Sequence, residues 1–324
     1  MALLPSFALL IAGIICLIIA GDLLVRGAAA LARHWGIPAL IVGLTIVAFG
    51  TSAPEMVVSI QAVMQGAGTL ASGNVVGSNI ANVLLALGLP ALIAAIPTNM
   101  PGVGRNSLIA LAASVIFIAL AFIQNPLQTW QGAILFGGIL IYLTYMFRLA
   151  KQGADDPILA EMTEIEEGEN GLPANIMKSG LFVLIGLIGL AIGGDLIVKN
   201  AVNIAGVMGV SETVIGLTIV AIGTSLPEVA TVMVAAYRGH SEVAIGNVLG
   251  SNIFNVFAVL GAASLAGPVG IDKEIFVFDF WVMLATMIVL LAFVMRRLPI
   301  GRKTGFVFLM GYGLYLAALV RGVM

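Results

Sequence analysis

Two short stretches place possible cation ligands in the middle of long apolar segments. GTSAPE (residues 50–55) and GTSLPE (residues 223–228) each combine two hydroxyls, a proline and a carboxylate. Proline lacks an N–H and crowds the carbonyl four residues back, so Pro54 is expected to deprive the carbonyls around Ala48 to Thr51 of helical partners. In hydrocarbon such carbonyls must face protein, water or an ion. All these ligands are oxygens, which suit Na⁺, Ca²⁺ and Mg²⁺ better than zinc or copper.

The two carboxylates in these stretches are the strongest candidates. A charged side chain at the bilayer centre costs about 2.5–3.5 kcal/mol on insertion scales. A single buried glutamate could be a protonated side chain that binds no ion, or a hydrogen-bond partner between helices. Two of them, Glu55 and Glu228, at equivalent positions favour an ion site over packing.

A second pair of motifs follows, GNVVGSNIAN (73–82) and GNVLGSNIFN (246–255). Their glycines are typical of surfaces that let helices approach closely. The serine and the last asparagine of each motif are four residues apart, so they share a helical face. We expect Asn79 and Asn252, which point about 100° away from the serines, to hold the broken helix in place. For Asn74 and Asn247 a ligand role and a structural role both stay open.

The two motif pairs belong to an internal repeat. Residues 43–88 and 216–261 align without a gap at a shift of 173, with 25 of 46 positions identical. A duplicated unit of five helices must enter the membrane from the opposite side in its second copy. Inverted repeats are typical of secondary transporters, whose site lies at the midplane between the halves. Duplication alone could build a symmetric scaffold, but here the best-matching segments are the polar ones.

The composition predicts the elements that hold these motifs. Of 324 residues, 60% are hydrophobic and 9% charged, against about 45–50% and 25% in soluble domains. We therefore predict an all-α integral membrane protein with ten transmembrane helices arranged as two inverted five-helix repeats. The expected spans are about 4–26, 38–65, 69–96, 107–123, 128–148, 177–200, 211–237, 242–265, 275–295 and 302–321. The first span lacks the basic n-region of a signal peptide, so we keep it as a helix.

The basic residues predict the orientation. With ten spans, eleven Lys and Arg residues fall on the side of the linker 149–176 and three on the other. The positive-inside rule then makes the linker cytoplasmic and both termini external, that is, periplasmic. The chain divides into a first five-helix repeat (1–148), the acidic linker (149–176) and a second five-helix repeat (177–324). The linker is interpreted as a solvated segment rather than a cation sensor, because it lacks the spaced ligands of an EF-hand.

Several classes of site are excluded. One cysteine and two histidines rule out an intrachain disulfide and a histidine-rich metal site. No basic patch suggests nucleic acid, and no HExxH pair suggests a metalloprotease. Asp22 with Arg26, and Asp195 with Lys199, are interpreted as local i,i+4 ion pairs, and the methionines as packing residues.

At this point the doubled GTSxPE and GNxxGSNIxN motifs resemble the α-repeats of the cation/Ca²⁺ antiporter superfamily, and most closely the prokaryotic sodium/calcium exchanger family. The resemblance covers essentially the whole chain and implies four ion sites at the centre of a ten-helix fold. It implies a Ca²⁺ site, also open to Na⁺, made by Glu55, Glu228 and the carbonyls of Thr51 and Thr224. It implies two flanking Na⁺ sites, one made by the Ala48 carbonyl, Ser52 and Ser78 and the other by the Ala221 carbonyl, Ser225 and Ser251. Asn82 and Asn255 would complete the central position, where some relatives carry an acid in place of Asn255.

The function implied is Na⁺/Ca²⁺ exchange by alternating access, with Ca²⁺ efflux driven by Na⁺ influx, in an inner membrane. Small cations and the lipid bilayer are the expected partners, with no cofactor, no nucleic acid and no protein partner. Coupling to H⁺ is the first alternative, although proton-coupled relatives tend to replace the hydroxyls that Thr51, Ser52, Thr224 and Ser225 retain here. K⁺ coupling, another divalent ion and a passive channel stay open as alternatives, and an enzyme is not expected.

Overall fold

The structure is a computed structural model, and it describes residues 4–154, 173, 175–207 and 221–321. Within these ranges the chain is helical, without a named β-strand, and two isolated bridges pair Ile96 with Ile300 and Leu127 with Val269. In chain order the α-helices are α1 (Leu4–Trp35), α2 (Ala39–Val42), α3 (Ala48–Thr51), α4 (Ala53–Met64), α5 (Gly68–Ala81), α6 (Gly88–Ala91), α7 (Val103–Ile123), α8 (Thr129–Ala154), α10 (Ile176–Val207), α12 (Ala221–Thr224), α13 (Leu226–Tyr237), α14 (Ser241–Phe254), α15 (Gly261–Ala266), α16 (Phe280–Met295) and α17 (Arg302–Arg321). Four π-helical segments lie between them: η1 (Gly43–Val47), η2 (Asn82–Ala86), η5 (Asn255–Leu260) and η6 (Ile275–Asp279).

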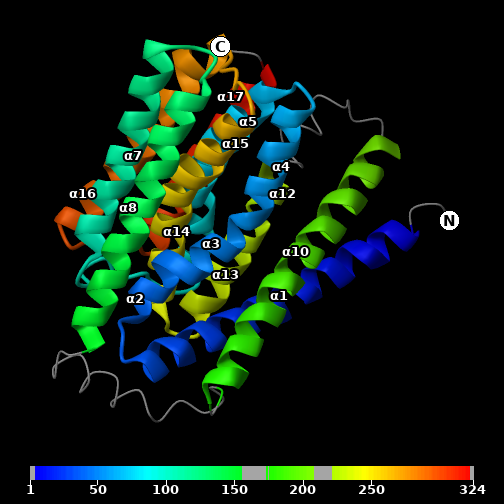
Figure 1. The fold of residues 1–324 in the computed structure, drawn as a ribbon. Coiled ribbons are helices and arrows are strands. Elements are labelled where there is room, and N and C mark those ends of the chain that lie inside the picture. The colour runs from blue at the N-terminus through cyan, green and yellow to red at the C-terminus, as the bar shows by residue number, and fades with distance from the viewer. Residues whose placement is uncertain (1–3, 155–172, 174, 208–220, 322–324) are drawn as a thin grey trace.

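Two long helices lean against one side of a helical bundle. α1 and α10 pack along each other outside the bundle and run in opposite directions (Figure 1). Their contact is close because glycines line it. A Cβ added to Gly27 would lie 2.8 Å from the Ser179 carbonyl oxygen, and one added to Gly186 would lie 2.7 Å from the Leu24 nitrogen. Small residues permit such backbone approach in membranes.

The helices are apolar and long enough for a multi-pass membrane protein. Among the described residues, seven helices could cross a bilayer, and the bent pair Ala39–Thr51 and Ala53–Met64 would make an eighth. The count does not reach the predicted ten. The expected span 211–237 is described only from Ala221, and α17, which coincides with the expected span 302–321, is not among the seven. The outer faces fit lipid, since large apolar side chains such as Ile141 and Phe147 are exposed on α8.

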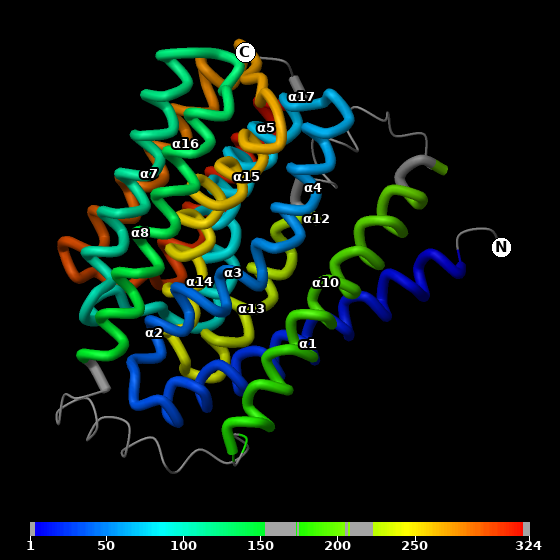
Figure 2. Tube along the Cα trace, viewed as in Figure 1, coloured from blue at the N-terminus to red at the C-terminus, as the bar shows by residue number. Residues whose placement is uncertain are grey.

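Both GTSxPE motifs break their helix at the serine. Ser52 (φ −87°, ψ 0°) separates α3 from α4, and Ser225 (φ −89°, ψ 3°) separates α12 from α13. A proline follows two residues later in each case, in the first turn of the new helix, where its missing N–H costs little. The path of α2, η1, α3 and α4 bends by 41° at this break (Figure 2). The two copies of the motif therefore fold alike.

The helix that carries the second copy of the GNxxGSNIxN motif, α14, lies at the centre of the bundle. α14 is buried along its length from Val243 to Phe254. A Cβ on Gly250 would lie 2.7 Å from the Leu44 carbonyl oxygen, which confirms the predicted packing role of this glycine. In the first copy of the motif, the contacts equivalent to this one would join Gly73 and Gly77 to residues 208–220, which the structure does not describe. The predicted packing role of these two glycines is therefore not tested.

Candidate ion-binding site

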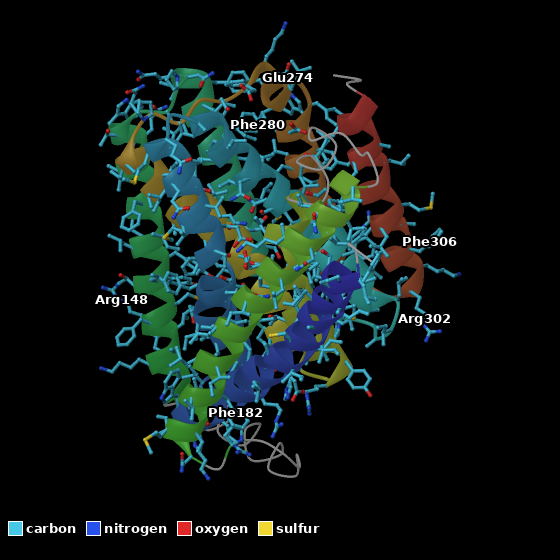
Figure 3. All side chains as sticks on the ribbon, turned by 90° about the vertical axis from the view of Figure 1, so that its right-hand side faces the viewer. Arg148, Phe182, Glu274, Phe280, Arg302 and Phe306 are labelled. Carbon is cyan, nitrogen blue, oxygen red and sulfur yellow. The ribbon has the colours of Figure 1, made fainter. Side chains whose placement is uncertain are left out.

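The two helix breaks meet the two GNxxGSNIxN helices inside the bundle. Side-chain oxygen and nitrogen atoms gather there at about mid-height of the molecule (Figure 3). Both carboxylates are almost fully enclosed, since Glu55 and Glu228 are each 1% exposed. Glu55 lies in the first turn of α4 and Glu228 in the first turn of α13. The positive end of each helix dipole therefore helps to stabilise a negative charge at these positions.

Hydroxyls from both halves of the chain surround Glu228. The Ser52 hydroxyl donates to Glu228 Oε1 at 3.3 Å, and the Ser251 hydroxyl reaches the same oxygen at 3.5 Å. Ser52 lies at the break of the first half, whereas Ser251 lies on α14 of the second. The site is therefore composite, and neither half could form it alone.

Glu55 has a different environment. Neither of its carboxylate oxygens has a hydrogen-bond partner among the described residues, and the Glu228 carboxylate lies close enough to repel it. A buried charge without a partner is strongly destabilising. A cation between the two carboxylates would relieve both the missing hydrogen bonds and the repulsion.

The two threonines of the motifs contact asparagines of the opposite half. The Thr51 hydroxyl donates to Asn247 Oδ1 at 3.1 Å, and the Thr224 hydroxyl donates to Asn74 Oδ1 at 3.4 Å. These contacts are related by the shift of 173 residues. Because the hydroxyls are engaged in this way, Asn74 and Asn247 act as structural partners in this conformation.

The central asparagines lie at helix irregularities. Asn82 is the first residue of η2 and Asn255 the first of η5. π-helical turns inside α-helices are frequent at functional sites. The amide nitrogens donate across the halves, from Asn82 to Asn252 Oδ1 at 3.0 Å and from Asn255 to Asn79 Oδ1 at 3.1 Å.

Unpaired buried oxygens concentrate at the expected ligands. Most buried polar atoms in proteins have a hydrogen-bond partner. Among the described residues, buried side-chain oxygens without one occur on six of the expected ligands: Glu55, Ser78, Asn82, Ser225, Glu228 and Asn255. No three Asp, Glu, His or Cys residues cluster in the described part of the chain. A donor set of hydroxyl, amide and paired carboxylate oxygens fits a hard cation.

One expectation about the backbone is wrong. The Ala48 carbonyl keeps its helical partner, because it accepts the Ser52 N–H at 3.0 Å, and the Thr51 hydroxyl oxygen lies 3.3 Å from it. The reason is that the helix breaks only after Thr51, so Ser52 still bonds back to it. The equivalent residue of the second half, Ala221, is the first residue of α12, and its side chain lies outside the part of the chain that the structure describes. The same expectation is therefore not tested for Ala221.

Three contacts were not predicted from the sequence. Met283 and Met287 accept hydrogen bonds from Asn79 and Asn252, although the methionines were interpreted as packing residues. Met283 and Met287 are four residues apart and so share one helical face, and this spacing was the sequence feature that could have indicated their common role. Arg238, one of the eleven basic residues counted on the side of the linker, forms an ion pair with Asp22 in addition to the Asp22–Arg26 pair at 3.5 Å. No sequence pattern predicts a pair 216 residues apart.

Comparison with known proteins agrees with this geometry. The family model described as "Sodium/calcium exchanger protein" matches the chain twice, at residues 5–148 and 178–321. The chain is 35% identical over 322 residues to the inner membrane protein YrbG of Escherichia coli, covering 98% of this chain and 97% of that protein. It is 32% identical over 343 aligned positions to the sodium/calcium exchanger MaX1 of Methanosarcina acetivorans, covering 97% and 98%.

The fold is also that of a solved exchanger. The structure superposes on the sodium-calcium exchanger NCX_Mj with a TM-score of 0.81 and 29% sequence identity. The match covers 98% of this chain and 99% of the other. Similarity thus extends over both halves.

Proposed function

The chain belongs to the sodium/calcium exchanger protein family, and we propose that it exchanges Na⁺ for Ca²⁺ across the membrane by alternating access. The observation that carries this proposal is the buried pair Glu55 and Glu228 within a set of unpaired oxygens. Two carboxylates neutralise one Ca²⁺ or two Na⁺. Either load could therefore cross a low-dielectric barrier, whereas an empty site would leave two like charges buried.

The proposed architecture is ten transmembrane helices in two inverted five-helix repeats, residues 1–148 and 177–324, joined by the linker 149–176. Three observations support it. The two matches to the family model are related by the same shift of 173 residues as the motifs. The breaks at Ser52 and Ser225 share their backbone angles. α1 and α10, the first helices of the two halves, run antiparallel (Figure 1).

We assign the ions to the residues that the motifs single out. Glu55, Glu228 and the carbonyls of Thr51 and Thr224 would hold Ca²⁺. The two Na⁺ sites beside it would use Ser52 and Ser78 with the Ala48 carbonyl, and Ser225 and Ser251 with the Ala221 carbonyl. Asn82 and Asn255 would complete the central position. The unpaired oxygens of Ser78 and Ser225 support the flanking sites, and Ser52 and Ser251 already reach Glu228 between them.

The direction proposed is Ca²⁺ efflux driven by Na⁺ influx across an inner membrane, without a cofactor. The relative YrbG is named as an inner membrane protein. The motion proposed is a sliding of α1 and α10 against the rest, in which their glycine-lined contact with each other would let them move as a closely packed pair.

The test is ⁴⁵Ca²⁺ uptake into sealed proteoliposomes that hold Na⁺ inside. An outward Na⁺ gradient should drive uptake, and replacing internal Na⁺ by choline should abolish it. Uptake driven by a pH gradient or by K⁺, and not by Na⁺, would overturn the assignment of the coupling ion. Downhill Ca²⁺ flux that is independent of every counter-ion would indicate a channel.

A further inference from the structure

Behind the candidate site, four buried asparagines form two chains of hydrogen bonds that run from α16 to the centre. In the first, the Asn252 amide donates to the Met287 sulfur at 3.2 Å, and Asn252 Oδ1 accepts the Asn82 amide at 3.0 Å. In the second, the Asn79 amide donates to the Met283 sulfur at 3.8 Å, and Asn79 Oδ1 accepts the Asn255 amide at 3.1 Å. Each chain joins an asparagine of one half to an asparagine of the other.

Both chains have the same direction. A thioether sulfur can only accept a hydrogen bond, so it draws the NH₂ end of the outer asparagine, Asn79 or Asn252, towards α16. The carbonyl of that outer asparagine then faces inward and can only accept, so it draws the NH₂ end of the inner asparagine. The carbonyl oxygen of the inner residue is left at the end of the chain. In Asn82 and Asn255 this oxygen is buried and has no partner among the described residues.

The direction of each hydrogen-bond chain matters because the two ends of an amide side chain have opposite hydrogen-bonding roles. A carboxylate presents an oxygen whichever way it turns, whereas an asparagine can present either an oxygen or an NH₂ group. An NH₂ group facing a cation would repel it. We propose that Asn79 and Asn252 are positioning residues that hold Asn255 and Asn82 with their carbonyl oxygens towards the transported cation. This inference rests on the proposed function, since it names what orients two ligands of that site.

The burial of all four side chains supports an ordered arrangement. Asn79, Asn82, Asn252 and Asn255 are each at most 1% exposed, as are Met283 and Met287. Water is therefore poorly placed to compete for these amides. The Asn79 amide also reaches the Asn252 carbonyl oxygen of the backbone at 3.4 Å, which further fixes its NH₂ end away from Asn255.

The experiment compares one substitution in two backgrounds. Asn79→Leu removes the acceptor of the Asn255 amide while keeping the branched shape of the side chain. In the otherwise unsubstituted protein it should raise the Ca²⁺ concentration needed for half-maximal thermal stabilisation of the purified protein by about tenfold. In the Asn255→Asp background there is no amide to orient, so the same substitution should change this concentration by less than about threefold. Equal effects in both backgrounds would indicate simple packing and overturn the proposal.

Two further measurements keep the outcome decisive. Asn252→Leu with and without Asn82→Asp repeats the test in the symmetry-related chain, and it replaces the first pair if Asn79→Leu does not fold. Asn106→Leu is the matched control, because Asn106 is a fully buried asparagine on α7 that bonds to Gly102 and Tyr142. It should lower the melting temperature without changing the Ca²⁺ dependence. Absence of any stabilisation by Ca²⁺ or Na⁺ in the unsubstituted protein would instead contradict the proposed function.

Discussion

At the scale of single residues, the two glutamates carry the same charge in unequal surroundings. Glu228 accepts hydroxyl contacts from Ser52 and Ser251, whereas neither oxygen of Glu55 has a partner in the described part of the chain. A bound cation should therefore contribute more to satisfying Glu55 than Glu228. This asymmetry leads to a prediction about neutralising each carboxylate.

Glu55→Gln and Glu228→Gln should each abolish exchange, because one remaining carboxylate cannot neutralise Ca²⁺. Removing one partner of a buried charge pair costs about 2–5 kcal/mol, or about 30-fold or more in binding. Without ions, Glu55→Gln should also raise the melting temperature, because it removes an uncompensated buried charge. Ca²⁺ flux and thermal unfolding in ion-free buffer measure the two effects. Asp195→Asn, at a side chain that is 55% exposed, is the control and should leave both unchanged. Near-normal flux in either glutamine variant would contradict the site.

A smaller difference between the halves concerns the asparagines that hold the threonines. The Asn74 amide donates to the Ser59 hydroxyl at 3.1 Å. The residue equivalent to Ser59 in the second half is Val232, and there the Asn247 amide has no partner in the described structure. An unsatisfied buried donor is costly, so the second half contains a local defect that a single hydroxyl could repair.

Val232→Thr should therefore stabilise the protein by about 1 kcal/mol, because threonine matches the shape of valine and offers an acceptor to Asn247. Thermal or denaturant unfolding in detergent measures the change. Val243→Thr is a suitable control, since it places a hydroxyl at another fully buried valine, on α14. That control should be neutral or destabilising. A loss of stability in Val232→Thr comparable to that of the control would show that the Asn247 amide is satisfied in some other way.

At the scale of elements, the contact between α1 and α10 holds together the two helices that the proposed motion moves against the rest of the molecule. Gly186 lies where a Cβ would approach the Leu24 nitrogen at 2.7 Å and the Ala20 carbonyl oxygen at 2.9 Å, and backbone atoms cannot turn aside. A Cβ added to Gly180, on the same helix, would have no neighbouring atom of the described structure within 4 Å. The two glycines therefore form a matched pair.

Gly186→Ala should separate α1 from α10 and impair exchange, at a cost of about 1–3 kcal/mol typical of overpacking. Gly180→Ala should be neutral or stabilise its helix by about 0.5–1 kcal/mol. Flux in proteoliposomes, normalised to folded protein, measures the first effect, and thermal unfolding measures both. Equal and normal flux in the two variants would contradict a functional role for the close contact.

The elements also show what sequence patterns could and could not predict. The doubled GTSxPE motif predicted a disturbed helix beside Pro54, and the break is there, but at Ser52, so the Ala48 carbonyl keeps its partner. The π-helical turns at Asn82 and Asn255 were not predicted, since a local change of helical register depends on tertiary packing rather than composition. The pairing of Asn79 with Asn255 could not be predicted either, because it joins residues 176 apart.

At the scale of the whole molecule, the repeat and the orientation are linked. Because five is odd, the second copy of a five-helix unit would enter the membrane from the opposite side, as in transporters built from inverted repeats. The first helices α1 and α10 are antiparallel, as inversion requires (Figure 1).

The orientation can be tested with single cysteines, because the chain contains only Cys16. In a Cys16→Ala background, Glu164→Cys in the linker should be protected from a membrane-impermeant maleimide in intact cells and react after permeabilisation. Lys273→Cys, at one of only three basic residues expected outside, should react in intact cells. Cys16 contributes one hydrogen bond, from its thiol to the Gly189 carbonyl at 3.3 Å, so its replacement should be tolerated. The reverse labelling pattern would place the linker outside and contradict the proposed orientation, and equal labelling at both positions would place them on one side and contradict the ten-span topology.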